Sequence, residues 1–137
     1  MDRHLIKAAC DQAARSNMVW GRDDCSLWVC NLVLAATGVD LAAPLRGYRS
    51  RLGAARKLKS FAGGGLCRAA AKIAATAQLR EAYWPWCGDL VGIVAGDEGP
   101  TLALFWNGVW LGRTETGFRA LPAKLGVMAW ELPKCQL

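Results

Sequence analysis

Cys25 is the residue whose type and position could most directly do chemistry. It follows Asp23 and Asp24 and comes just before an apolar run over residues 27–34. Asp24 is well placed as the N-cap of a helix, because its carboxylate can accept the free backbone N–H groups of the first turn. Cys25 would then lie in that turn, where the helix dipole favours a thiolate. This position is what a cysteine nucleophile needs, but a cysteine at a helix start more often serves as a small buried packing residue.

A cysteine nucleophile needs a partner that takes the thiol proton and later protonates the leaving group. His4 is the only histidine of the chain. It could serve as the base only if the N-terminal helix placed it beside Cys25, and no sequence pattern predicts that. Asp23 and Asp24 could act as acid and base, but neighbours at a helix start usually point apart. A helix cap and an ion pair to Arg22 are the predicted uses of the two carboxylates.

The chain contains six cysteines, which is a large number for a protein of this size. They stand at positions 10, 25, 30, 67, 87 and 135. No Cys-x-x-Cys pair and no Cys/His group of zinc type occurs among them, so reduced and mostly buried thiols are expected. Ligation of a metal or an iron–sulfur cluster by distant cysteines is the alternative. We expect neither a metal nor another cofactor.

The positive charge of the chain is concentrated in its middle third. The net charge is +6, and residues 41–80 carry nine Lys/Arg and no acidic residue. The candidate interaction surface consists of six of these residues: Arg46, Arg49, Arg51, Arg56, Lys57 and Lys59. Such a surface could meet nucleic acid, a phosphate-rich envelope or an acidic protein, and the alternative is a solvated helical face.

The pattern of elements predicts a single α+β domain over residues 1–137, helical to about residue 80 and a sheet over 87–133. Helices are expected at 3–16, from Cys25 to Gly38, at 51–62 and at 66–78. Short strands are expected at 90–95, 101–106, 109–111, 117–121 and 127–132, with a tight hairpin at Asn107-Gly108. No apolar run is long enough to cross a bilayer and no signal pattern opens the chain, so it is expected to stay in the cytosol unless a particle carries it out.

Three further segments carry predictions about what surrounds them. In the third helix, Leu52, Ala55, Leu58 and Phe61 are predicted to face inward. The alanine-rich fourth helix is predicted to pack deep in the domain. The run Tyr83-Trp84-Pro85-Trp86 is a rigid aromatic linker, predicted to fill the junction between the helices and the sheet; the alternative is an exposed recognition patch.

Several motifs of the chain are similar to those of known families. Asp24-Cys25-Ser26 at a helix start resembles the nucleophile motif of NlpC-type cell-wall cysteine peptidases. The longer run Trp20–Trp28 resembles an uncharacterised family of phage and prophage proteins (the domain of unknown function 6950 type), encoded among tail genes and regarded as a relative of those peptidases. That similarity also takes in Thr37–Asp40, Leu45–Tyr48, Gly53–Arg56, Cys87–Val91 and Ala129–Leu132.

The resemblance implies a papain-like, NlpC-like fold, with N-terminal helices packed on a small curved antiparallel sheet. In NlpC-type enzymes the histidine stands on the sheet, shortly after a Gly-Asp-hydrophobic strand like Gly88–Val91. The matching place here is near the start of Thr101–Phe105, which holds no residue able to shuttle a proton at neutral pH. The motif is therefore expected to persist for structural reasons, with Cys25 vestigial.

The leading hypothesis from the resemblance is a structural phage tail protein at or near the tail tip, made in the host cytoplasm and carried in the virion. Its partners would be other tail proteins, with peptidoglycan as a further contact. A nucleic-acid-binding module is the weaker alternative, and no membrane insertion is expected. The main alternative is an active cysteine peptidase or amidase that degrades peptidoglycan during DNA delivery. Cys25 would then be the nucleophile, and its backbone N–H would contribute to the oxyanion hole.

Overall fold

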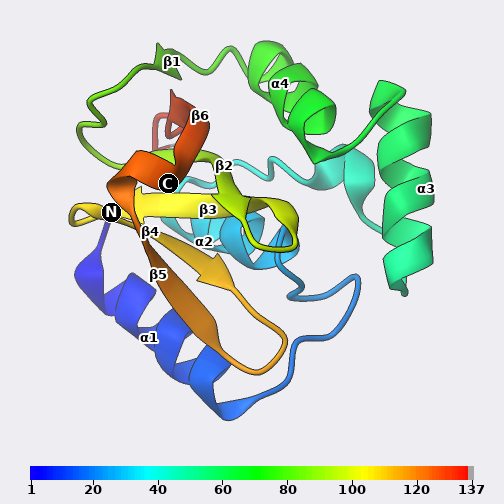
Figure 1. Ribbon diagram of the computed structural model, residues 1–137, viewed down its shortest axis with the longest axis horizontal. Coiled ribbons are helices and arrows are strands. Elements are labelled where there is room, and N and C mark those ends of the chain that lie inside the picture. Colours follow the sequence, from blue (N-terminus) through cyan, green and yellow to red (C-terminus); the bar gives the residue numbers. More distant parts are fainter. Residues whose placement is uncertain (136–137) are drawn as a thin grey trace.

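The helices of the protein come first and are followed by an antiparallel sheet, as a computed structural model of residues 1–135 shows (Figure 1). Within these residues the α-helices are α1 (Arg3–Arg15), α2 (Leu27–Thr37), α3 (Arg51–Ala62) and α4 (Leu66–Thr76). Two 3-10 turns are η1 (Ala43–Leu45) and η2 (Ala123–Leu125). The strands are β1 (Glu81–Ala82), β2 (Leu90–Gly96), β3 (Gly99–Trp106), β4 (Val109–Arg113), β5 (Phe118–Pro122) and β6 (Gly126–Glu131). The α+β class predicted from the sequence is confirmed.

The sheet has the strand order β1-β6-β2-β3-β4-β5, and every pairing is antiparallel. The hairpin between β3 and β4 pairs Trp106 with Val109. Asn107 and Gly108 form its turn with φ angles of 50° and 83°. Both angles are positive, as a type I′ turn requires, so the predicted Asn-Gly hairpin is confirmed. Strand β1, which pairs with β6 at Glu81 and Trp130, was not predicted.

The two faces of the sheet carry separate apolar clusters, because successive side chains of a strand point to opposite faces. Leu102 and Leu104 of β3 belong to the cluster that includes α1, α2 and α4. Ala103 and Phe105 of the same strand pack on the other face around Trp110. Figure 1 shows α2 behind β3 and β4, with α1 beside it. The helices therefore cover one face of the sheet.

Helix α2 is the central element of the helical layer. Its buried residues lie on all sides: Leu27, Trp28, Val29, Cys30, Leu32, Val33 and Thr37. A helix that is apolar all round is stable only when surrounded by other elements. Gly38 ends it with φ 80°, and its N–H donates to the carbonyl of Leu34, which is the predicted C-cap. The helix begins at Leu27, two residues after the predicted start. No helix in residues 1–135 is long and apolar enough to span a membrane.

Helices α3 and α4 differ from the predictions in what they bury. The bounds of α3 are those predicted, and the Ser50 hydroxyl accepts the Gly53 N–H at 3.0 Å. Leu52, however, is 60% exposed, and α3 has no buried residue. Ala55 is exposed as well, so the predictions that Leu52 and Ala55 face inward are wrong. The reason is that α3 packs on α4 and η1 at the edge of the molecule and not on the sheet (Figure 1). Of the alanines of α4, Ala69 and Ala74 are buried while Ala71 and Ala75 are exposed, so the deep packing holds for one stripe only.

Candidate functional site

The buried carboxylate of Asp24 organises the start of α2. It is 1% exposed. It accepts the backbone N–H groups of Gly21 at 2.9 Å and of Ser26 and Leu27 at 3.1 Å, and the Tyr48 hydroxyl at 2.7 Å. The Asp24 carbonyl also accepts the Trp28 N–H at 2.9 Å. These bonds satisfy donors that the first turn of a helix leaves without partners. Asp24 therefore caps α2 from three residues before its first helical residue.

Gly21 and Tyr48 join two sequence motifs that are distant along the chain. Gly21 has φ +83°, and a Cβ at this position would lie 1.9 Å from the carbonyl oxygen of Tyr48. Only a glycine allows this close approach of two backbone segments. Burial, and then the hydrogen bond to Asp24, raise the pKa of Tyr48 far above its usual value. Tyr48 therefore stays a neutral hydrogen-bond donor. Its contact with Asp24 has no local signal in the sequence and was not predicted.

Cys25 is half-buried just before α2, and the hydroxyl groups of Ser26 and Thr101 lie near its sulfur. Burial raises the pKa of its thiol, and the negative charge of Asp24 raises it further. Hydrogen bonding from Ser26 and Thr101 lowers the pKa, but the raising effects prevail. The raised pKa differs from the thiolate that the helix dipole led us to expect. The reason is that Cys25 precedes the first helical residue and lies beside a carboxylate. At neutral pH the group is a thiol.

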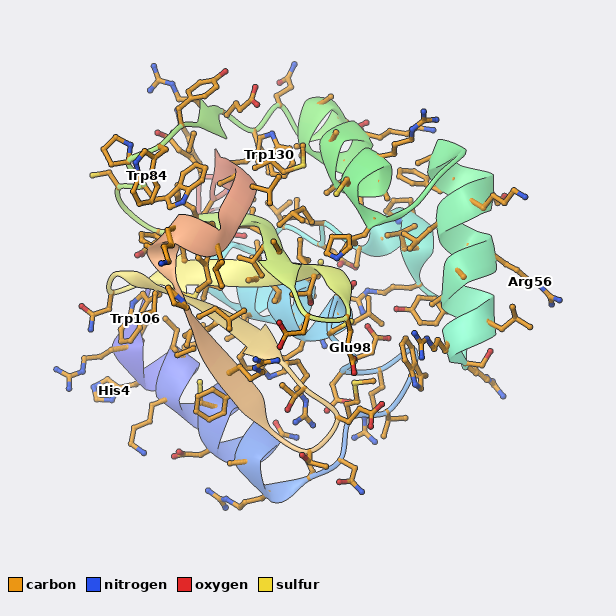
Figure 2. The ribbon with its side chains drawn as sticks, viewed as in Figure 1. His4, Arg56, Trp84, Glu98, Trp106 and Trp130 are labelled. Carbon is orange, nitrogen blue, oxygen red and sulfur yellow. The ribbon has the colours of Figure 1, made fainter. Side chains whose placement is uncertain are left out.

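Thr101, near the start of β3, lies within hydrogen-bonding reach of the Cys25 sulfur. This is the segment in which the resemblance to NlpC-type enzymes places the histidine. His4, the one histidine considered as the base, is exposed in the first turn of α1. Figure 2 shows its ring on the outer side of that helix. The structure thus brings Cys25 together with Asp24 and Thr101, while His4 points to solvent.

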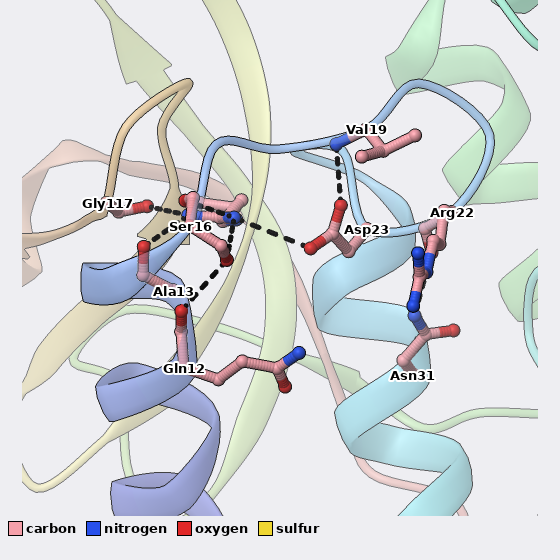
Figure 3. A network of polar contacts seen from close by, with 9 residues as sticks. Gln12, Ala13, Ser16, Val19, Arg22, Asp23, Asn31 and Gly117 are labelled. Carbon is pink, nitrogen blue, oxygen red and sulfur yellow. Dashed lines mark hydrogen bonds and ion pairs between the residues drawn. The ribbon is translucent and has the colours of Figure 1, made fainter.

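Arg113 is a buried residue of this region that the sequence did not indicate. It is 4% exposed at the end of β4. Its guanidinium donates to the carbonyls of Ala13 and Gly117 at 2.8 Å and of Ser16 at 3.0 Å. It also pairs with the Asp23 carboxylate at 3.4 Å. The network of Figure 3 thus connects α1, the β4–β5 turn and the segment before Cys25.

The partners of Arg22 and Asp23 differ from the prediction of an ion pair between the two residues. Asp23 accepts the Val19 N–H at 2.7 Å with one carboxylate oxygen and pairs with Arg113 through the other. The Arg22 carbonyl accepts the side-chain amide of Asn31 at 3.0 Å. An ion pair of Asp23 with Arg22 is therefore not formed, because the buried guanidinium of Arg113 takes its place.

The remaining cysteines form no metal site within residues 1–135, where no cluster of three or more His, Cys, Asp or Glu could hold a metal ion. Cys30 is buried in α2, and its burial raises the pKa of the thiol to about 12. Cys135 donates to the Ala36 carbonyl at 3.6 Å.

Two hollows flank the start of α2. An apolar cavity of about 50 Å³ lies between α2, α4 and the sheet, with Ser26 and Tyr48 in its wall. A groove of about 350 Å³ runs between α1 and α2, with Arg22 and Asp23 at one end and Trp28 in its wall. Cys25 lines neither of them. The sulfur is therefore outside both hollows.

The predicted basic surface is largely exposed on and before α3. Arg49, Arg51, Arg56 and Lys59 are exposed and Lys57 is half-buried. Figure 2 shows Arg56 pointing away from the molecule. Arg46 differs from these five: its guanidinium makes two 2.9 Å bonds to the Asp40 carboxylate and one of 2.9 Å to Asn31. Arg46 therefore fixes the segment after α2.

The aromatic linker divides into a half-buried residue and two exposed ones. Trp86 is half-buried, and its indole N–H donates to the Ala123 carbonyl at 3.0 Å. Tyr83 and Trp84 are exposed instead. Trp86 packs against Trp110 on the sheet face opposite the helices, so the prediction that the linker fills the junction between the helices and the sheet is wrong.

Comparison with known proteins adds a family to this description. The model of a family described as "Domain of unknown function (DUF6950)" matches residues 2–132. No curated protein and no solved structure matches the chain. The match includes the start of α2, the sheet and the aromatic linker.

Proposed function

The chain belongs to the DUF6950 family, and from this premise we propose that it is a structural component of a phage tail, at or near the tail tip. In this proposal it has a degenerate cysteine-peptidase scaffold of the NlpC kind. The tail placement is supported by the resemblance of its motifs to a family encoded among tail genes. Its partners are other tail proteins, with peptidoglycan as a further contact.

The observation that carries the non-catalytic role is the environment of Cys25. Its hydrogen-bonding neighbours are the hydroxyl side chains of Ser26 and Thr101, and the pKa of its thiol is raised. Neither hydroxyl can accept the thiol proton near neutral pH. General acid–base catalysis contributes about a hundred- to ten-thousand-fold, so a site without it is a poor peptidase.

The order of elements supports the link to the papain-like scaffold. A cysteine precedes the central helix α2, the helices precede the sheet, and Thr101 on β3 lies beside the cysteine. Asp24 gives the retained motif a structural use, since four donors converge on its carboxylate. The start of α2 can therefore persist without chemistry at Cys25.

The second candidate is an active cysteine peptidase or amidase acting on peptidoglycan. The observation that favours it is the partial exposure of Cys25 at the start of α2. Its thiol would be the nucleophile and its backbone N–H part of an oxyanion hole. This candidate requires a base that the partners of the sulfur do not supply.

The experiment compares two alleles in a phage that encodes this chain. Deletion of the gene should abolish infectious particles, whereas Cys25→Ala should leave the titre and the tail morphology unchanged. Mass spectrometry of purified virions should detect the chain. Its absence from virions would overturn the tail assignment. Muropeptide release by the purified wild type that is lost in Cys25→Ala would instead establish the peptidase.

A further inference from the structure

Helix α3 presents one exposed and positively charged side to the solvent. The helix has no buried residue, and Figure 1 shows it at the outer edge of the molecule. Its exposed positions recur every three to four residues, so they lie on one side of the helix. We call this side the α3 face; its members are Arg51, Leu52, Ala55, Arg56, Lys59 and Ser60.

The positive charge of the α3 face is not neutralised by the protein itself. Arg51, Arg56 and Lys59 form no ion pair within residues 1–135, where the ion pairs involve other cations. The elements around them offer no acid either, because α3, α4 and η1 contain no Asp or Glu. Unpaired surface cations of one sign attract a polyanion, whose binding releases the counterions condensed on it. The α3 face is therefore complementary in charge to a polyanion.

The cations of the α3 face stand at both of its edges. At 3.6 residues per turn, Arg51 and Arg56 lie about 140° apart around the helix axis. Ala55, Lys59 and Leu52 fall between them, at about 40°, 80° and 100° from Arg51. Two long cationic side chains thus flank a strip that contains a small and an aliphatic residue. Along the axis, Arg51 and Lys59 are separated by about 12 Å, at about 1.5 Å per residue.

This layout matches the major groove of double-stranded DNA. An α-helix with its side chains is about 10–12 Å across, and the major groove is about 12 Å wide. A helix in the groove has a row of phosphates on either side, which the cations at its two edges can reach. Because α3 stands at the edge of the molecule, the rest of the domain does not cover this side of the helix (Figure 1).

Other partners fit the α3 face less well. A helix that lies in a membrane interface needs a broad apolar side, whereas Leu52 is the one large apolar member of this face. Single-stranded nucleic acid binds through stacking on aromatic rings, and the face contains none. A protein interface is centred on buried aromatic or aliphatic anchors within an apolar patch, which the face also lacks. The regular phosphates of a duplex are the better match.

We propose that the α3 face binds double-stranded DNA through its phosphates, without reading the sequence. Arg51 and Arg56 bind phosphates on opposite sides of the groove, and Lys59 binds a third one further along the helix. Ala55 and Leu52 have no side-chain hydrogen bond to offer to a base edge, so the contacts are to the backbone. This binding goes beyond the proposed tail function and makes no use of Cys25.

The test is fluorescence anisotropy of a labelled random-sequence duplex, titrated with the full chain at several salt concentrations. The wild type should bind at low salt, with an affinity that falls steeply as the salt concentration rises. The triple variant Arg51→Gln/Arg56→Gln/Lys59→Gln should bind about tenfold or more weakly. The slope of log affinity against log salt should also decrease by about 2.7, since each lost phosphate contact removes about 0.9.

The matched control removes the same charge elsewhere. Arg3→Gln/Arg15→Gln/Lys124→Gln replaces three cations that are also exposed but lie on α1 and η2. It has the net charge of the α3 variant and should bind the duplex nearly as the wild type does. Circular dichroism and thermal melting check that both variants are folded.

Three results would contradict the proposal. A wild type that does not bind the duplex even at low salt excludes DNA as the partner. Equal weakening by the two folded triple variants would show attraction by net charge and no role for the α3 face. Binding to phosphatidylglycerol vesicles but not to the duplex would assign the face to a membrane. Cys25→Ala should bind the duplex like the wild type, so this proposal and the tail proposal can fail separately.

Discussion

The Tyr48 hydroxyl donates a 2.7 Å hydrogen bond to the buried carboxylate of Asp24. The bond connects the segment before α3 with the start of α2. The backbone also meets there, since Gly21 lies against the Tyr48 carbonyl. The Asp-Cys-Ser motif is thus part of a structural junction, whatever the chemistry of its cysteine.

Asp24→Ala should strongly destabilise the protein. The variant leaves the Tyr48 hydroxyl and three backbone N–H groups without their acceptor, so we expect a loss of about 3 kcal/mol or more in the free energy of unfolding. Tyr48→Phe removes one donor and should cost about 1 kcal/mol. Urea denaturation measures both. Asp97→Ala is the control, because the Asp97 side chain is 94% exposed and should change stability little.

Arg113→Ala should destabilise the protein by about 3 kcal/mol or more, because three carbonyls and the Asp23 carboxylate lose their shared buried donor. Arg119→Ala is the matched control, since the Arg119 side chain is 55% exposed and its ion pair with Asp97 is long, at 4.0 Å. Thermal melting of both variants checks the prediction. Equal melting temperatures for the two would show that the network of Figure 3 adds no net stability.

Stability should fall at alkaline pH because of Cys30. Burial raises the pKa of its thiol from 9.0 to about 12 in the folded protein. Between these values the folded state keeps a proton that the unfolded state has lost, so the free energy of unfolding decreases as the pH rises. Three units correspond to about 4 kcal/mol at most. In Cys30→Ala the decrease between pH 9 and 12 should be shallower, as urea denaturation at several pH values would show. Parallel profiles for the two proteins would contradict the assignment to Cys30.

The sequence predicted the elements well where local chemistry defines their ends. Ser50 and Gly63 bound α3 at both ends, and Asn107-Gly108 sets the β3–β4 hairpin. The prediction from the sequence failed where tertiary packing decides which residues are buried. Leu52 has helical spacing for an inward position, but α3 packs mainly on α4 and η1. Strand β1 has two residues, too few for any periodicity.

The site was predictable only in part, for the same reason. Asp24 has a local signal as a helix cap, and the hydrogen bonds of its carboxylate agree with it. Tyr48 lies 24 residues from its partner Asp24 along the chain, and Arg113 lies 90 residues from its partner Asp23. No local sequence pattern indicates either contact. The sequence also favoured a thiolate at Cys25, because it showed the helix start but not the burial that raises the pKa of the thiol.

Thr101→His tests whether Cys25 and β3 retain the geometry of a catalytic pair. An imidazole at this position would lie beside the sulfur, and a nearby imidazolium lowers the pKa of a thiol. Each unit of decrease raises the thiolate fraction about tenfold at neutral pH. Alkylation of Cys25 by iodoacetamide at pH 7, followed by peptide mapping, should therefore accelerate about tenfold or more over the wild type.

Val127→His is the control, because it adds the same side chain at a 61% exposed strand position and should leave the rate unchanged. If Thr101→His folds and Cys25 reacts no faster, the two residues do not correspond to a cysteine–histidine pair, and the link to a peptidase scaffold loses its geometric support.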